Sequence, residues 1–197
     1  MHHDFPIDPD SIIETSSTAV CDTSPAEMQP QPFHFPKASS DCRNENYALM
    51  LRSCFCGRDS ELSSAICYLY QSIRFSCCSD ELCTALYDMA MRRFKAAKLL
   101  GDLICSLGSD PKFFCGKSGN APAGSWWNAS PTVLRYPQHI GDALQTAIRR
   151  ERAMAEEYKS FAAYIDDVSV CRILEQLRSE KLQDIHTLTL FYTRFCS

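Results

Sequence analysis

The stretch Met91–Gly108, MRRFKAAKLLGDLICSLG, predicts a helix that packs into a bundle. With the residues just before it, it forms a stripe with one member every three or four positions, as on a helix face that contacts partner helices. The stripe consists of Leu82, Leu86, Met89, Arg93, Ala96, Leu100, Leu103 and Leu107. All members except Arg93 are apolar, so the sequence places a permanent cation in the middle of a face that should be buried.

Four long segments share this helical periodicity, at about residues 59–76, 80–107, 139–165 and 167–195. The first is expected to bury Leu62, Ala65, Ile66, Leu69 and Ile73 on one face, after a cap at Asp59 or Ser60. Ser79 or Asp80 can cap the second, and Gly108 ends it. No strand pattern competes with these helices. The sequence therefore predicts an all-α fold.

Residues 108–137 are rich in Gly and Pro and are expected to form one long connection. Two helical hairpins joined by a single long crossover, here between the second and third helices, form the ferritin-like four-helix topology. Residues 1–45 are different, because they are rich in Pro, Ser and Thr and carry a net charge of −6, against +2 for the remainder. We interpret residues 1–45 as a disordered acidic tail and residues 46–197 as the bundle.

Several function classes lose support from the sequence. The chain has no cluster of Lys and Arg, which argues against a nucleic-acid partner. It has no apolar run of the roughly 18 residues that a membrane span needs. Its start, MHHDFPIDPD, lacks the pattern of a signal peptide, so a cytoplasmic location is expected. It also lacks a nucleophile elbow, a phosphate-binding Gly motif and H-E-x-x-H.

The chain has 12 cysteines, which is many for its length. Most lie in helical patterns, where a free cysteine behaves as a small buried apolar residue. The pairs in CFC (54–56) and CC (77–78) lie at element ends and could be exposed, which would permit intermolecular cross-linking or redox sensitivity. Metal binding by cysteine is a third possibility, although neither spacing matches a C-x₂-C zinc site.

Charged residues interrupt the other apolar faces as well. Glu151 lies mid-stripe in the third helix, and Lys181 and Asp184 in the fourth, while Glu61 lies at the edge of the first. Burying one unpaired charge costs several kcal/mol, comparable with the stability of a whole domain. Charge on four converging helices therefore indicates one shared site inside the bundle.

Three pieces of sequence, in order, resemble the ferritin-like superfamily, in particular bacterial manganese-catalase-like and rubrerythrin-like proteins. They are DSELSSAICYLYQ, then LLGDLICSLGSDPKFF followed by SWW and LRY, and then ERAMAEEY, and the resemblance spans about residues 58–195. It implies a bundle with a dimetal site, where two helices each supply one Glu and the other two each supply Glu-x-x-His. Glu61 and Glu151 stand at the single-Glu positions.

The remaining ligand positions depart from that pattern. Where the second helix should read Glu-x-x-His, this chain has Arg93 and Ala96, and where the fourth should, it has Lys181 and Asp184. No Glu-x-x-His occurs anywhere, and His186 is two residues past Asp184, about 200° around the helix. We therefore expect a degenerate dimetal site without catalytic residues and without bound metal.

Three arrangements of these charges are open. Arg93 and Lys181 can form an internal salt-bridge network with Glu61, Glu151 and Asp184. The net charge of this network is −1, which protonation of one acid or a further basic residue would neutralise. The two cations can instead extend outward to solvent. The third arrangement is an unconventional metal site built from Glu61, Glu151, Asp184 and a cysteine.

The sequence thus favours a non-catalytic structural or interaction protein, a pseudo-enzyme that associates with itself or with protein partners. The resemblance makes a spore-coat or assembly role in a bacterium one expectation, because some manganese-catalase-like proteins are coat components. The alternative is a dimetal oxidoreductase that uses two Mn or Fe ions to handle peroxide or oxygen.

Overall fold

The computed structural model describes residues 37–113 and 136–196, which belong to one unit of the chain, Phe33–Ser197. This part of the chain is entirely helical, with α1 (Glu45–Cys56), α2 (Glu61–Arg74), α3 (Asp80–Ser106), α4 (Ile140–Tyr164) and α5 (Val168–Cys196). None of these helices is long and apolar enough to cross a membrane. The tail expected through residue 45 lies mostly outside the described residues.

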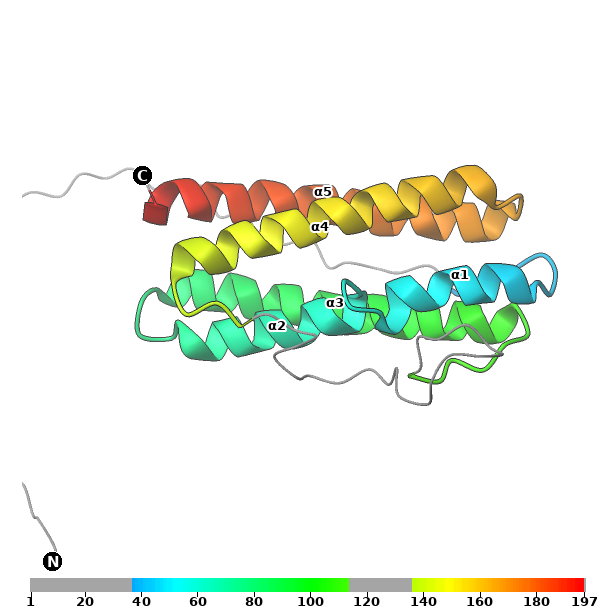
Figure 1. Ribbon diagram of the computed structural model, residues 1–197, viewed down its shortest axis with the longest axis horizontal. Coiled ribbons are helices and arrows are strands. Elements are labelled where there is room, and N and C mark those ends of the chain that lie inside the picture. The colour runs from blue at the N-terminus through cyan, green and yellow to red at the C-terminus, as the bar shows by residue number, and fades with distance from the viewer. Residues whose placement is uncertain (1–36, 114–135, 197) are drawn as a thin grey trace, which may run out of the picture. The chain divides into compact units, whose positions relative to one another are not determined.

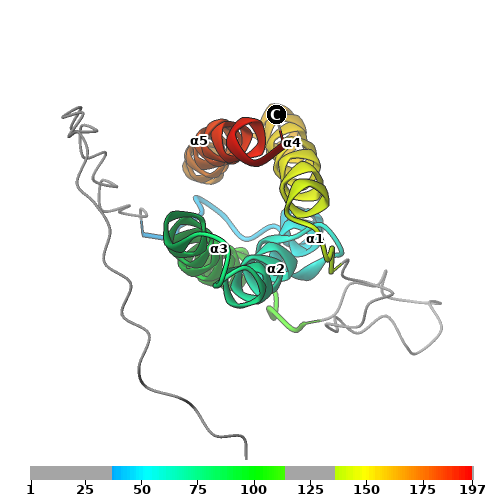
Figure 2. The same cartoon turned by 90° about the vertical axis from the view of Figure 1, so that its left-hand side faces the viewer.

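The helices form two hairpins. α1 and α2 follow one another along α3, and α4 runs along α5 (Figure 1). Viewed from one end, the two hairpins face each other and enclose a common interior (Figure 2). The connection from α3 to α4 is the long crossover, of which residues 114–135 lie outside the described residues. The predicted all-α bundle with its crossover between the second and third bundle helices is confirmed.

The first bundle helix differs from the prediction, because it begins at Glu45 and consists of two pieces. Asn44 starts α1 by accepting backbone N–H groups of Asn46 and Tyr47, at 3.1 and 3.2 Å. The chain leaves the helix at Gly57 and restarts at Ser60, whose hydroxyl accepts the N–H of Ser63 at 3.1 Å. The prediction therefore found α2 but missed α1.

The predicted buried face of α2 is wrong in part. Ile73 is 68% exposed, and Leu62, Ile66 and Leu69 are only half-buried. The buried face instead carries Glu61, Ser63, Ser64, Ala65, Cys67, Tyr68, Gln71 and Ser72. A helix that directs a carboxylate and a tyrosine hydroxyl into the interior must rotate its apolar stripe toward the edge.

The core consists of two apolar clusters separated by charge. One cluster joins α1 to the second half of α3 and includes Leu51, Leu103 and Met154. The other joins α2 to the first half of α3 and includes Leu86 and Leu144. Along α3, α4 and α5 the charged residues lie between members of the two clusters, so the bundle has a polar layer across its middle.

A buried charge network in the centre of the bundle

All five charged residues singled out in the sequence point into the bundle. Glu61, Arg93, Glu151 and Lys181 are fully buried, and Asp184 is 3% exposed. Glu61 is the first residue of α2, Arg93 lies in the middle of α3 and Glu151 in the middle of α4, while the other two lie on α5. The outward arrangement of the cations is therefore wrong.

Glu61 accepts three hydrogen bonds. Its Oε2 receives Lys181 Nζ at 2.8 Å and Arg93 Nη1 at 3.2 Å. Its Oε1 receives the hydroxyl of Tyr158 on α4 at 2.5 Å. This fully buried carboxylate is thus satisfied by donors from three other helices.

Lys181 bridges the two glutamates. Its Nζ lies 3.0 Å from Glu151 Oε2 as well as 2.8 Å from Glu61 Oε2. The other oxygen of Glu151 accepts the hydroxyl of Tyr68 at 2.7 Å. The ammonium group therefore occupies the space between the carboxylates of α2 and α4.

Arg93 spans from Glu61 to Asp184. Its Nη2 donates to Asp184 Oδ2 at 2.6 Å, while Arg92 Nη2 donates to the other oxygen of Asp184 at 2.7 Å. Arg92 was not singled out in the sequence, where it flanks the stripe, and its side chain is 23% exposed. Arg92 is thus the further basic residue that can neutralise the net charge of −1 expected from the sequence.

Glu180 was also missed. It is 1% exposed, its Oε2 lies 3.7 Å from Arg93 Nη2, and neither oxygen has a hydrogen-bond partner. Burial raises its pKa to about 8, against the opposing attraction of Arg93, so it holds a proton at neutral pH. With Glu180 neutral, Glu61, Glu151 and Asp184 balance Arg92, Arg93 and Lys181.

The other buried groups respond to the same field. Burial disfavours the charged form of Glu151, but Lys181 and Arg93 outweigh it and lower the pKa of that carboxyl. Burial also disfavours the Arg93 guanidinium, yet the surrounding carboxylates, Glu61 first, raise its pKa well above the ordinary value. Burial and the adjacent glutamates raise the pKa values of Tyr68 and Tyr158, which therefore remain donors.

Ala96 and the histidines lie apart from these contacts. Ala96 is buried in the apolar cluster next to α1. His186 is exposed on α5, as the sequence predicted, and His139 precedes α4. Among the described residues, no group of three or more His, Cys, Asp or Glu side chains is arranged to hold a metal ion.

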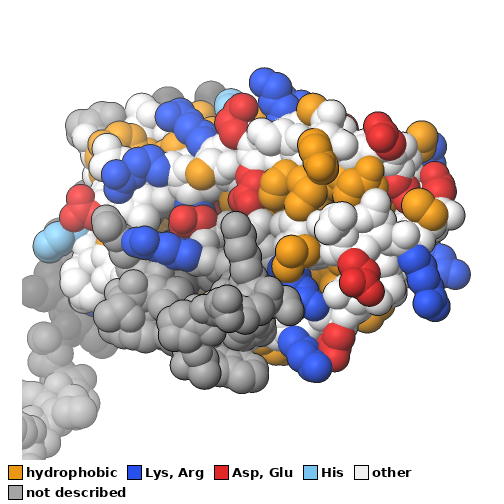
Figure 3. Space-filling view, turned by 45° about the vertical axis from the view of Figure 1, so that its right-hand side comes forward, with side chains coloured by type: hydrophobic (Ala, Val, Ile, Leu, Met, Phe, Trp, Pro, Cys, Tyr) orange, Lys and Arg blue, Asp and Glu red, His pale blue; other side chains and the backbone are white. Residues whose placement is uncertain are grey.

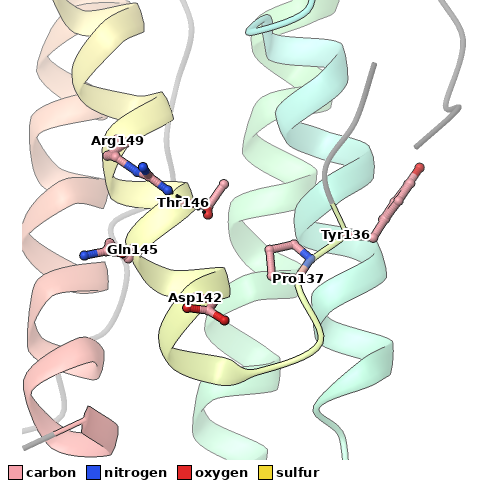
Figure 4. Close-up of a pocket in the computed structure, with 6 residues that line it drawn as sticks. All are labelled: Tyr136, Pro137, Asp142, Gln145, Thr146 and Arg149. Atoms are coloured by element: carbon pink, nitrogen blue, oxygen red, sulfur yellow. Dashed lines mark hydrogen bonds between the residues drawn. The ribbon is translucent and has the colours of Figure 1, made fainter. Parts of the chain in front are cut away.

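A surface hollow of about 410 Å³ lies beside α4 (Figure 4). It is lined by Tyr136, Pro137, Asp142, Gln145, Thr146 and Arg149. None of the residues that line it belongs to the charge network, so the hollow and the network are separate features.

No family model matches the sequence, and no curated protein does. Among solved structures, the chain is similar to KatB, a manganese catalase from Anabaena PCC7120, with a TM-score of 0.67 and 20% identity over 81% of this chain and 76% of that one. It is also similar to the bacterioferritin of Desulfovibrio desulfuricans, which has a diiron site, with a TM-score of 0.59 and 17% identity over 76% and 81%. Identities this low show the fold alone, and the expected ferritin-like fold is confirmed.

Proposed function

We propose that this chain is a non-catalytic structural or interaction protein, built on a ferritin-like bundle whose dimetal ligands have been replaced by an internal charge network. One observation carries the proposal. Lys181 Nζ lies between Glu61 and Glu151, 2.8 and 3.0 Å from their carboxylate oxygens. A cation of the chain itself takes the place that a bridging metal ion would need.

The residues present do not fit a two-metal centre. A transition-metal ion binds carboxylate oxygens at about 2.0–2.2 Å, which would put it where the ammonium group lies. The guanidinium of Arg93 fills the adjacent space between Glu61 and Asp184, at 3.2 and 2.6 Å. The network offers no imidazole ligand, and its cations repel a metal ion. We therefore assign no metal-dependent step to this chain.

The position of the charged residues along the chain supports the same proposal. The sequence resemblance puts Glu61 and Glu151 at single-Glu ligand positions and Arg93 at the Glu of a Glu-x-x-His motif. Ala96 stands where its His would be. Lys181 and Asp184 stand at the corresponding positions of the last helix. The two cations thus neutralise the retained carboxylates, which would otherwise be buried without counter-charges.

Metal content tests the proposal directly. The chain, purified without a tag from cells supplied with Mn and Fe, should contain far less than one ion of either per chain by elemental analysis. It should not accelerate decomposition of hydrogen peroxide above the buffer rate. Two equivalents of Mn or Fe per chain would contradict the proposal.

A variant with half of the metal motif restored provides a sharper comparison. Arg93→Glu with Ala96→His adds a carboxylate and an imidazole while it removes one internal cation. We expect it to be less stable than the parent and to regain melting temperature when Mn²⁺ or Fe²⁺ is added. Arg194→Glu makes the same charge change in an exposed ion pair and should not respond to metal.

A dimetal oxidoreductase that handles peroxide or oxygen is the second candidate. The similarity to a manganese catalase and a diiron bacterioferritin favours it, as do the two retained glutamates. Two Mn or Fe ions at Glu61, Glu151 and Asp184 would require Lys181 and Arg93 to leave. Metal content and peroxide turnover, measured as above, decide between the candidates.

We further propose that the protein acts in an assembly with itself or with other proteins, in the bacterial cytoplasm or associated with spores. Large apolar side chains at the α4–α5 turn support a contact surface, since Tyr164 and Val168 are 67% and 64% exposed. Apolar side chains gather on one face among charged ones (Figure 3). Fractionation of cells and spores with an antibody to the chain would test the location.

A further inference from the structure

The prediction for the cysteines is confirmed in part, because Cys77 and Cys78 are exposed as expected, and it is wrong at three other positions. Cys54 and Cys56 lie near the end of α1 but are buried, as is Cys67. Cys105 lies within α3 but is exposed. The exposed thiols are those of Cys42, Cys77, Cys78, Cys105 and Cys196. Five exposed free thiols in one bundle are unusual, because accessible thiols oxidise readily.

Three of these thiols lie at one end of the bundle. Cys77 and Cys78 form part of the turn between α2 and α3, with their Sγ atoms 4.0 Å apart. Cys196 is the last residue of α5, and its Sγ packs against Gly141 in the first turn of α4. The α2–α3 turn, the start of α4 and the end of α5 share this end of the molecule (Figures 1 and 2).

The other two lie at the opposite end. Cys105 belongs to the last turn of α3, and Cys42 precedes α1. The two segments meet there, because the N–H of Asn44 donates to the carbonyl of Leu107 at 3.0 Å. Exposed thiols therefore mark both ends of the bundle.

The neighbouring pair is poorly placed to form a disulfide with itself. Consecutive Cα atoms are about 3.8 Å apart, whereas the two Cα atoms of a disulfide usually lie about 4.4–6.8 Å apart. Cys77 and Cys78 also lie on an exposed turn, where nothing described covers them. Both thiols are consequently available to a second molecule.

We propose that the two ends of the bundle are covalent linkage sites, at which copies of this chain join one another through intermolecular disulfides. The inference rests on the proposed assembly role and specifies the bonds that would hold the copies together. A thiolate of one copy attacks a low-molecular-weight disulfide, which releases one small thiolate and leaves a mixed disulfide. A thiolate of a second copy then attacks the protein sulfur and releases the other small thiolate. The small disulfide is reduced by two electrons, and the two protein thiols are oxidised.

Placement at both ends determines the product. When thiols lie at one end alone, two copies that link across that end cover it for each other, which favours a dimer. A bundle with thiols at both ends can join two partners and extend into chains. The structure thus predicts oligomers longer than a dimer.

The test uses full-length chains in which Cys21 and Cys115, outside the described residues, are replaced by Ser. Two variants of this parent keep two of the five exposed thiols and replace the others by Ser. The first keeps Cys78 and Cys105, at opposite ends, and the second keeps Cys78 and Cys196, at the same end. Each is treated with oxidised glutathione and analysed by non-reducing electrophoresis and peptide mapping.

We expect a ladder of trimers and longer species from the opposite-end variant and mainly dimers from the same-end variant. Dithiothreitol should collapse both to monomer. Local desolvation and the neighbouring Cys77 thiol raise the pKa of Cys78 in the parent, so its cross-linking should become faster as the pH rises.

Three results would overturn the inference. They are identical ladders from the two variants, monomers that carry only glutathione or an internal disulfide, and cross-links that map to Cys54, Cys56 or Cys67. Unchanged melting temperatures of the variants show that the Ser substitutions leave the fold intact. Metal content is measured separately, so failure of the cross-linking is distinguishable from failure of the proposed metal-free scaffold.

Discussion

Arg93 is held at both of its terminal nitrogens, by Glu61 through Nη1 at 3.2 Å and by Asp184 through Nη2 at 2.6 Å. Its removal leaves Glu61 with Lys181 and Asp184 with Arg92, but takes one positive charge from a buried layer that is neutral only while Arg93 is present. The cost therefore arises from carboxylates that stay buried with too little positive charge, rather than from the lost contact alone.

Replacing Arg93 by Ala should lower the free energy of unfolding by roughly 3–5 kcal/mol. Urea denaturation followed by circular dichroism measures this. Arg194→Ala is the matched control, because Arg194 pairs with Glu81 at the surface with 61% and 64% exposure, and should cost less than about 1 kcal/mol. Equal effects of the two substitutions would contradict a buried network.

Glu180 predicts a distinctive pH dependence. Its pKa is raised from 4.5 to about 8 in the folded chain, so between these values the folded state holds a proton that the unfolded state has released. Its contribution to stability is therefore present at low pH and is lost as the pH rises through that window. The slope approaches roughly 1.4 kcal/mol for each pH unit.

Glu180→Gln removes this titration. We expect the variant to gain stability relative to the parent as the pH rises from 5 to 8, measured by chemical denaturation at each pH. The control is Glu175→Gln, since Glu175 is an exposed side chain on the same helix. A stability difference that stays constant with pH would show that Glu180 is charged in the folded state.

The sequence identifies the network's central residues but not all of its members. Arg93, Glu151, Lys181 and Asp184 are recognisable because each interrupts an apolar stripe of period 3.6. Arg92 and Glu180 adjoin stripe positions, where periodicity alone cannot tell an inward side chain from an outward one. Their roles depend on the approach of α3 to α5, which is a property of tertiary packing.

At the level of single helices, the break between α1 and α2 explains why the prediction began too late. The segment Glu45–Cys56 buries Ala48, Leu51, Cys54 and Phe55, a helical spacing that was present in the sequence. Gly57 and the cap at Ser60 interrupt the pattern, so the prediction places residues 46–58 in the bundle but assigns no helix to them. The orientation of α2 was also hard to predict, because its buried face carries Ser63, Ser64 and Ser72 instead of large apolar side chains.

Gly57 tests the cause of this break. Its N–H donates to Ser53 O at 2.9 Å, and a Cβ at this position would lie only 2.4 Å from that carbonyl oxygen. Gly57→Ala should therefore destabilise the bundle by about 1–3 kcal/mol, because backbone must shift.

Gly101→Ala is the control for that substitution. Gly101 lies within α3, and its Cβ would meet the Phe55 ring at an ordinary 3.5 Å. In a helix, Ala is favoured over Gly by about 0.5–1 kcal/mol, so this variant should be as stable as the parent or more stable in thermal denaturation. Destabilisation by Gly101→Ala but not by Gly57→Ala would reverse the expected order.

For the whole molecule, the topology was predictable and the organisation of the core was not. Two short turns and one long connection define two hairpins with a crossover, whatever the details of packing. The polar layer between two apolar clusters emerges only when the hairpins meet. The ion pairs from Lys181 to Glu61 and from Arg93 to Asp184 join one hairpin to the other, as does the hydrogen bond from Tyr68 to Glu151.

We infer that such a layer sets how the hairpins align, although it need not add stability. Buried ion pairs replaced by apolar residues of similar size often leave a protein equally stable or more stable by about 1–4 kcal/mol, whereas loss of one partner is costly. We therefore predict opposite outcomes for partial and complete removal of the layer. Lys181→Met alone should destabilise the chain by roughly 3–5 kcal/mol.

Complete removal combines Lys181→Met with Arg93→Met, Glu61→Leu and Glu151→Leu. It also includes Tyr68→Phe and Tyr158→Phe, so that no tyrosine hydroxyl loses its acceptor. Asp184 keeps Arg92, and Glu180 stays neutral. This variant should unfold at a higher urea concentration than Lys181→Met and at least at that of the parent. If it unfolds earlier than Lys181→Met, the charges contribute net stability. If it is as stable as expected, the network serves to align the two hairpins rather than to stabilise the chain. Broadened or multiple amide resonances in the NMR spectrum of the variant would then show that the alignment is lost.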